Sequence, residues 1–256
     1  MTTRGVFDAL TIGVPAKDAG DLLPEMLRSL PAGAQVVVVD GGSRDNTVEL
    51  SLAAGATVIP QNLGEIRRHG GNFDLARNQV AEVASRPWLL FLDADERLTP
   101  ELCQELEQVL DQPQSAVAFD VPRVNLYWGR PVRALGNDFQ RRLVRRGCGR
   151  FSGEALHRQM EVDGPVGRLS NPIIHLNVRS WRDVVARFSG RVEIESGARR
   201  ERPSALDLIA GPWSLFRYYY LTNQARRDGV RGLAVSLIYA AHHGAVLWRR
   251  RQVDRA

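Results

Sequence analysis

The sequence predicts an α/β fold with a mainly parallel, Rossmann-like sheet, helices on both of its faces, and a mostly helical C-terminal extension. Three observations predict it. Strand-like and helix-like segments alternate over the first 120 residues, the strand-like runs are continuously apolar, and residues 181–251 show helical spacing of apolar side chains. The length of 256 residues fits one large domain or one domain with an appended subdomain. A hydrophobic fraction of 44% and a charged fraction of 25% exclude disordered, collagen-like and coiled-coil chains.

Strands and helices follow one another at short intervals in the first part of the chain. The run 36–39 is fully apolar and β-branched, which is typical of a strand buried on both faces of a parallel sheet. Thr99 and Pro100 predict the start of a helix, as its cap and its first helical residue. The expected strands are 10–15, 36–39, 56–60, 88–92 and 116–121, and the expected helices are 18–30, 45–54, 73–84 and the segment after Thr99.

The pattern changes after about residue 122. Residues 141–150 alternate apolar and basic side chains and predict a strand. Residues 181–251 predict helices that are interrupted at Pro203, at Gly211 with Pro212, and at Gly229. Because no low-complexity linker separates this part, we expect it to extend the first part and not to form an independent module.

The formal net charge of +5 conceals a division between the two parts of the chain. Residues 1–120 carry 9 basic and 18 acidic side chains, whereas residues 121–256 carry 25 basic and 11 acidic ones. Lys17 is the only lysine, so the basic part consists of arginine, whose forked guanidinium suits phosphate and carboxylate groups. The two parts are therefore expected to meet different partners.

Cysteine content and apolar segments bear on the compartment. Cys103 and Cys148 are too few for a disulfide framework, which predicts a reducing cytosolic setting, and the first ten residues lack the apolar core of a signal peptide. The most apolar stretch, 233–248, is shorter than the roughly 18 to 20 residues of a membrane span and ends in three arginines. Two interpretations follow: a helix that lies on a membrane surface, or one that packs on the protein's own core.

The first candidate site residue follows the strand 36–39. In an open parallel sheet, ligands bind at the carboxyl ends of the strands. Asp40 stands there, followed by Gly41 and Gly42, which allow a tight turn and close approach of the backbone to a ligand. Asp40 can accept hydrogen bonds from a ribose or a base edge. Alone, this segment is as compatible with a plain turn that ends in a helix cap as with a ligand site.

Three carboxylates follow the strand 88–92, at Asp93, Asp95 and Glu96. Carboxylates placed together repel one another unless a cation neutralises them, and an all-oxygen set suits Mg²⁺ or Mn²⁺. A single Asp-x-Asp sequence is more often structural than metal-binding. Its position at a strand end, together with Asp40 at an earlier strand end, favours a metal and nucleotide site.

Taken in order, these segments resemble the family 2 glycosyltransferases with the GT-A fold. The resemblance rests on residues 36–47, on the Arg77-Asn78 pair and on residues 89–98, and it spans residues 10–111. Residues 138–143, the segment through Gly153 to His157, and His175 look like the subgroup that includes lipopolysaccharide core β-glucosyltransferases. The resemblance implies a nucleotide-diphospho-sugar donor, a divalent cation and inversion at the anomeric carbon.

The resemblance also implies roles for individual residues. Asp40 would hold the uracil or ribose, and Asp93 would face the ribose and the cation. Asp95 would bind the cation that bridges the diphosphate, and Arg77 would lie near the diphosphate or the sugar. His175 matches a histidine that reaches the metal or diphosphate in some GT-A enzymes, but a buried core histidine is an equal alternative.

The sequence departs from the family pattern at two places. The first strand is usually followed by Asn-Glu, which helps to bind the base, whereas here the segment from Pro15 continues through Asp18, so Pro15 and Asp18 are our candidates for that contact. The subgroup usually has His-Glu where this chain has His157-Arg158. An inverting transfer needs one base for the acceptor hydroxyl, and the candidates are Glu154 and then Asp138.

We expect an enzyme with three segments: a nucleotide-sugar-binding half at 1–121, an acceptor and catalytic segment at 122–180, and an arginine-rich helical extension at 181–256. The expected partners are a nucleotide-sugar donor, with a UDP-sugar favoured, an anionic glycolipid or saccharide acceptor, and a membrane surface, but no nucleic acid. The expected location is the cytoplasm, peripherally at the cytosolic face of the inner membrane. The alternatives are a sugar-phosphate nucleotidyltransferase and a basic nucleic-acid-binding protein.

Overall fold

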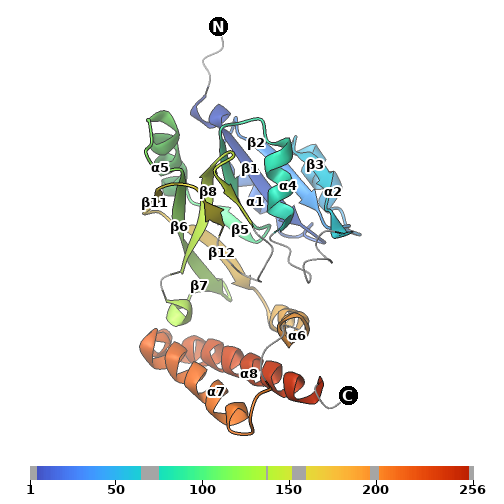
Figure 1. Ribbon diagram of the computed structural model, residues 1–256, viewed down its shortest axis with the longest axis vertical. Coiled ribbons are helices and arrows are strands. Elements are labelled where there is room, and N and C mark those ends of the chain that lie inside the picture. Colours follow the sequence, from blue (N-terminus) through green and yellow to red (C-terminus); the bar gives the residue numbers. More distant parts are fainter. Residues whose placement is uncertain (1–4, 65–74, 137, 152–159, 197–201, 254–256) are drawn as a thin grey trace. The chain divides into compact units, whose positions relative to one another are not determined.

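The computed structural model describes residues 5–64, 75–136, 138–151, 160–196 and 202–253 (Figure 1). A ten-stranded mixed sheet has the order β3-β2-β1-β4-β8-β6-β12-β5, with β11 and β7 beside β6. The chain divides into two compact units. The first, called unit 1 below, comprises Met1–Val124 and Phe139–His175, and the second, unit 2, comprises Asn125–Asp138 and Leu176–Ala256. The division into three segments that the sequence suggested stays a prediction.

The parallel part of the sheet consists of four strands near the N-terminus. They are β1 (Leu10–Ala16), β2 (Gln35–Asp40), β3 (Thr57–Pro60) and β4 (Trp88–Phe91), in the order β3-β2-β1-β4. All three pairings are parallel, and Ile12 of β1 pairs with Val36 on one side and Leu90 on the other. The carboxyl ends of these strands therefore meet at one edge, as the apolar runs predicted.

Helices connect the parallel strands close to the expected positions. They are α1 (Leu23–Arg28), α2 (Thr47–Ala53), α4 (Ala76–Val83) and α5 (Pro100–Asp111), preceded by the short helix η1 (Val6–Ala9). Thr99 caps α5, because its Oγ1 accepts a hydrogen bond from the Leu102 N–H at 3.1 Å. The start of the helix expected over 73–84 lies outside the described residues.

The helix α1 is shorter than the predicted helix over 18–30. Asp18 has a φ of 47°, which is not helical, and the N–H groups of Leu22 and Leu23 both bind the carbonyl of Ala19 in a turn. Pro24 then occupies the first helical turn, where its missing N–H costs nothing. The residues before Leu23 therefore form a loop at the end of β1, where a ligand contact was predicted.

The rest of the sheet is largely antiparallel and was only partly predicted. The long strands are β6 (Ala118–Tyr127), β8 (Asp138–Arg145) and β12 (Ile173–Val178), and β8 pairs antiparallel with β4. The strand expected over 141–150 is divided, because β8 ends at Arg145 and Gly147 turns the chain with a φ of 86°. The short strands of this sheet are β5 (Glu96–Leu98), β7 (Arg130–Pro131) and β11 (Val166–Arg168). The strands β9 (Gly149–Arg150) and β10 (Glu161–Val162) form a separate two-stranded antiparallel sheet.

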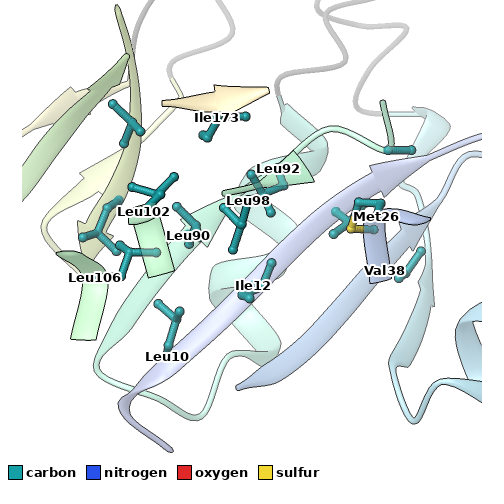
Figure 2. Packing of buried hydrophobic residues seen from close by; sticks show 14 of the residues in the cluster. Leu10, Ile12, Met26, Val38, Leu90, Leu92, Leu98, Leu102, Leu106 and Ile173 are labelled. Atoms are coloured by element: carbon teal, nitrogen blue, oxygen red, sulfur yellow. The ribbon is translucent and has the colours of Figure 1, made fainter. Parts of the chain in front are cut away.

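The core of unit 1 covers both faces of the sheet. Figure 2 shows one layer, in which Ile12, Leu90 and Leu98 belong to the same packed cluster as Leu102 and Leu106 of α5. Val37, Val39 and Phe91 point to the other face and pack with Val80 of α4. Successive residues of β2 and β4 are thus buried on opposite faces, which explains their continuous apolar runs.

Unit 2 is mostly helical after β12. Its elements are η3 (Arg133–Leu135), α6 (Trp181–Ser196), α7 (Asp207–Arg217), η4 (Tyr218–Thr222), η5 (Ala225–Asp228) and α8 (Gly229–Val253). Pro203 and Gly229 lie where helices are interrupted, as predicted. By length and composition, the helical segment Ala225–Gln252 is apolar enough to cross a membrane, and 33% of its most apolar window is buried within the protein.

The predicted interruption at Gly211 and Pro212 is wrong, because both residues lie inside α7. The absence of a Cβ at Gly211 lets α7 approach α8: a Cβ there would lie 3.0 Å from Nε2 of His243. A Cβ at Gly244 would lie 3.2 Å from Cγ of Pro212. Tight packing of α7 against α8 therefore outweighs the cost of a proline within the helix.

Candidate active site

The first part of the site is the turn after β2. The Asp40 carboxylate accepts hydrogen bonds from the N–H groups of Gly42, at 3.0 Å, and Ser43, at 3.2 Å, and from the Ser43 hydroxyl at 2.5 Å. Gly42 has a φ of 81°, a conformation that glycine adopts without strain. Asp40 therefore anchors the turn at the carboxyl end of β2.

The loop after β1 is tied to this turn. The Arg44 N–H donates to Oδ1 of Asp18 at 2.7 Å, and the Asp18 N–H donates to Oγ of Ser43 at 2.9 Å. Pro15 is half-buried in β1 opposite Val39, one residue before Asp40. The structure thus brings Pro15, Asp18 and Asp40 together at one edge of the sheet.

Asp45 also links the two loops and was missed as a contributor to the site. Its carboxylate accepts hydrogen bonds from the Thr47 hydroxyl at 2.5 Å and from the Gly20 N–H at 2.8 Å. These hydrogen bonds hold the pKa of Asp45 below its ordinary value. Asp45 was not among the predicted site residues, because its partner Gly20 lies 25 residues away in the sequence.

The second part of the site is the carboxylate of Asp93 at the end of β4. Its two oxygens are held by two guanidinium groups: Arg77 of α4 forms a short ion pair with Oδ1, and Arg142 of β8 lies 3.0 Å from Oδ2. Burial alone would raise the pKa of Asp93, but the charges of Arg77 and Arg142 outweigh it and hold the pKa well below the ordinary value. Asp93 is therefore an anion at neutral pH.

Behind Asp93 lies a buried ionic network that the sequence did not predict. Glu96 is fully buried, and its Oε1 lies 2.7 Å from Nη2 of Arg142 and 3.2 Å from Nη1 of Arg123. Its Oε2 accepts a hydrogen bond from the Asp93 N–H at 2.9 Å. A buried carboxylate requires such pairing, because an isolated charge in the interior is costly. The network fixes the backbone of the Asp93–Glu96 turn.

The third part of the site joins β5 and β12. His175 pairs with Glu96 in the antiparallel register, and its Nε2 atom lies 3.4 Å from Oδ2 of Asp95. Both side chains are largely buried, at 7% and 15% exposure. Asp95 and His175 offer one oxygen and one nitrogen ligand, which suits a cation whose other ligands come from a phosphate-bearing substrate.

A metal cage built by the protein alone is absent from the part of the chain that the structure describes: no three His, Cys, Asp or Glu side chains are placed to share an ion there. A cation at this edge of the sheet would take one or two ligands from the protein and the others from a diphosphate. Asp95 and His175 are the pair that could hold it. Asp93, the third predicted ligand, is occupied by Arg77 and Arg142.

The two candidate bases have different standing. Glu154 lies outside the described residues, as do His157 and Arg158. Asp138 is the first residue of β8 and belongs to unit 2, and its Oδ2 accepts a hydrogen bond from Nδ2 of Asn125 at 2.9 Å. The roles of both residues stay predictions.

Carboxylates lie at the ends of β1, β2 and β4, and two arginines hold the one after β4, an arrangement that is expected of the GT-A class of transferases. The chain belongs to the glycosyltransferases described as Glycosyl transferase family 2, whose sequence model matches residues 11–158. It is therefore a glycosyltransferase, and the predicted family, fold and enzyme class are confirmed. This membership argues against the nucleotidyltransferase and nucleic-acid-binding alternatives.

Individual relatives extend this assignment. The lipopolysaccharide core biosynthesis glycosyltransferase LpsC of Rhizobium meliloti is 26% identical over 243 residues, which cover 89% of this chain and 87% of LpsC. A TPR repeat-containing protein of Synechococcus elongatus is 37% identical over 128 residues, 49% of this chain and only 30% of that protein. The chain thus spans about a third of that longer relative.

Among solved structures, the mannosyltransferase PcManGT from Pyrobaculum calidifontis, in complex with GDP-Man and Mn²⁺, has a similar fold. The TM-score is 0.50 at 14% identity, and the match covers 97% of this chain and 88% of PcManGT. At this identity the likeness concerns the fold alone.

Proposed function

We propose that this glycosyltransferase moves a sugar, with inversion at the anomeric carbon, from a nucleotide-diphospho-sugar to a hydroxyl of a glycolipid or cell-envelope saccharide precursor, with the help of a divalent cation. One observation carries the proposal: Asp93 and Asp95 follow β4, Asp18 follows β1, and Asp40 ends the neighbouring strand β2, all at the same sheet edge. That edge is where a nucleotide binds in an open parallel sheet.

The donor would span the two groups of carboxylates. Asp40, with Asp18 and Pro15, would contact the base and ribose, and Asp93 would face the ribose. We favour a UDP-sugar, as the sequence suggested. PcManGT was solved with GDP-Man, so a guanine nucleotide is the main competitor.

The cation would be Mn²⁺ or Mg²⁺, held by Asp95 and His175 with Asp93 beside them. When bound, it stabilises the negative charge that develops on the departing diphosphate. Arg77 lies next to Asp93 and would contribute a second positive charge toward the diphosphate or the sugar. The 3.4 Å separation of Asp95 from His175 supports this assignment.

The acceptor is proposed from charge and from one relative. Residues 121–256 carry 25 basic and 11 acidic side chains, which favours an anionic acceptor. LpsC, which aligns with 89% of the chain, is named for lipopolysaccharide core biosynthesis. A base must remove the proton of the acceptor hydroxyl, and Glu154, then Asp138, remain the candidates. The enzyme would act peripherally at the cytosolic face of the membrane that holds the acceptor.

The proposal is tested by calorimetric titration of UDP-, GDP- and dTDP-sugars into the full chain, with and without Mn²⁺. We expect one nucleotide class to bind, and its affinity to rise with Mn²⁺ for the wild type but not for Asp95→Asn. Asp111→Asn, at the exposed end of α5, is the matched control and should behave as the wild type. Absence of binding by every nucleotide, or equal Mn²⁺ enhancement in Asp95→Asn, would contradict the proposal.

A further inference from the structure

The helix α7 exposes a row of large apolar side chains. Leu206, at the start of the helix, is 77% exposed, Ile209 is 74% exposed and Trp213 is 60% exposed. Spacings of three and four residues place them on one face of the helix. Gly211 lies on the opposite face and Pro212 lies at the flank of the row, and both pack against α8. The apolar row therefore faces away from the core of unit 2.

The helix α8 carries a second such row. Val230 is 83% exposed, Leu237 is 51% exposed and Trp248 is 55% exposed, and Leu233 and Ala241 complete the row at helical spacing. Other faces of α8 are buried, as Val235, Val246 and Leu247 show. The exposed apolar residues of the two helices are called the apolar rows below. They lie in rows, whereas the exposed apolar residues of an ordinary protein surface are scattered singly.

The charge around these rows is strongly positive. Residues 202–253 contain eight arginines, no lysine, no glutamate and two aspartates. Both aspartates already have partners: Asp207 accepts a hydrogen bond from the Ser204 N–H at 2.7 Å, and Asp228 pairs with Arg133. Arginines therefore dominate the surface potential of this segment. They are Arg202, Arg217, Arg226, Arg227, Arg231, Arg249, Arg250 and Arg251.

We propose that α7 and α8 bind the surface of an anionic lipid bilayer, with the apolar rows inserted at the level of the headgroups and the arginines paired with lipid phosphates. Exposed tryptophan, leucine and isoleucine beside arginine is the composition of helices that lie in a membrane interface. The inference deepens the proposed function, on which the choice of the cytosolic face rests.

A bilayer fits the apolar rows better than a second copy of the chain does. Two copies joined through these rows would bring their arginines together, and like charges across an interface are unfavourable. An anionic bilayer supplies the opposite charge, and each arginine near such a surface raises binding by about five-fold. The long arginine stems also let the guanidinium reach the phosphates while the apolar rows enter the lipid.

The contacts of α8 favour a helix that lies on the membrane over one that crosses it. The Tyr239 hydroxyl is 2.7 Å from the hydroxyl of Tyr127 in β6, and Arg250 donates from Nη2 to the Glu195 carbonyl of α6 at 2.6 Å. The side chains of His242 and Phe188 form an edge-to-face contact with ring centroids 5.5 Å apart. A spanning helix would lose these contacts and bring two histidines into hydrocarbon.

The experiment uses the full chain and vesicles of phosphatidylcholine alone or mixed with phosphatidylglycerol, followed by flotation at low and high salt. We expect binding to the mixed vesicles only, weaker at high salt, and release by alkaline carbonate. Trp213→Ser combined with Ile209→Ser should reduce binding at least about ten-fold, because two large apolar groups no longer insert. Arg226→Gln with Arg227→Gln should reduce it to a similar extent.

The control is Leu52→Ser on α2, a comparably exposed leucine at 57%, which should bind vesicles as the wild type does. Circular dichroism and donor titration on every variant establish that each is folded. Equal binding to neutral vesicles, unchanged binding by both double variants, or resistance to carbonate would overturn the proposal. The proposal would also be overturned if the wild type bound no vesicles and formed a dimer that is lost in the variant with Trp213→Ser and Ile209→Ser. A wild type that binds the donor but no vesicles would contradict this inference and leave the proposed function standing, so the two can fail independently.

Discussion

Arg142 reaches from β8 to Glu96, placing its Nη2 atom 2.7 Å from Oε1 of a carboxylate that is fully buried. The same guanidinium lies 3.0 Å from Asp93, so one buried arginine holds both the predicted donor-binding carboxylate and the glutamate behind it. The position of Asp93 therefore depends on a residue of β8 that lies 49 residues away in the sequence.

Replacement of Arg142 tests this dependence. Arg142→Met leaves Glu96 with Arg123 alone and removes one of the two cations at Asp93. We expect the free energy of unfolding to fall by about 3 kcal/mol, because a buried charge loses a partner. Chemical denaturation gives the value. Arg145→Gln, three residues along the same strand and exposed, is the control and should cost less than about 1 kcal/mol. A similar small loss in Arg142→Met would contradict the expectation.

Most of the parallel sheet could be predicted, because its signals are local. Continuous apolar runs gave β1, β2 and β4, and Thr99 with Pro100 gave the start of α5. The strand β5 is three residues long, and its place depends on pairing with β12, more than 70 residues later. No window of sequence around Glu96 contains that information.

The residues of the candidate site likewise divide into those that local sequence signals predict and those that they do not. Asp40, Asp93 and Asp95 could be chosen because each follows a predictable strand. The partners Arg142 and Arg123 could not, because they reach Glu96 from 46 and 27 residues away. The helix through Pro212 could not be predicted for a related reason. It is stabilised by packing on α8, which the local helix propensity of the sequence does not include.

The stability that Asp45 contributes by linking the loops after β1 and β2 should depend on pH. The pKa of Asp45 is lowered in the folded state, so its ionised form contributes stability above the unfolded pKa of about 3.9, and this contribution is lost as the pH falls through the folded pKa. We expect Asp45→Asn to melt at a lower temperature than the wild type at pH 7, with the gap narrowing below about pH 4. Thermal melts over this pH range measure it. A gap that stays constant with pH would show that ionisation of Asp45 does not stabilise the loops.

Replacement of His175 distinguishes its two predicted roles, a ligand of the cation and a buried histidine of the core. If His175 helps to hold the cation, His175→Asn should raise the Mn²⁺ concentration needed for half-maximal donor binding by about 10-fold or more. The nucleotide affinity without metal should change little, because His175 lies beside Asp95, whereas the base and ribose are expected at Asp40, which ends β2. Calorimetry with Mn²⁺ varied at fixed donor separates the two effects. A loss of stability with an unchanged Mn²⁺ requirement would identify a purely structural histidine.

Gly13 allows α4 to pack directly on β1, and this contact positions Arg77. A Cβ at Gly13 would lie 2.6 Å from Cγ1 of Val80, one helical turn after Arg77. We expect Gly13→Ala to lower the free energy of unfolding by about 2 kcal/mol through overpacking, and Val80→Ala to restore much of it in the double variant. Chemical denaturation of the four proteins in this cycle measures the coupling.

Gly5→Ala is the control, because a Cβ there meets nothing within 4 Å. Additive losses in the double variant would mean that α4 and β1 do not compete for this space. Donor titration should follow the same pattern, since a displaced α4 would draw Arg77 away from Asp93.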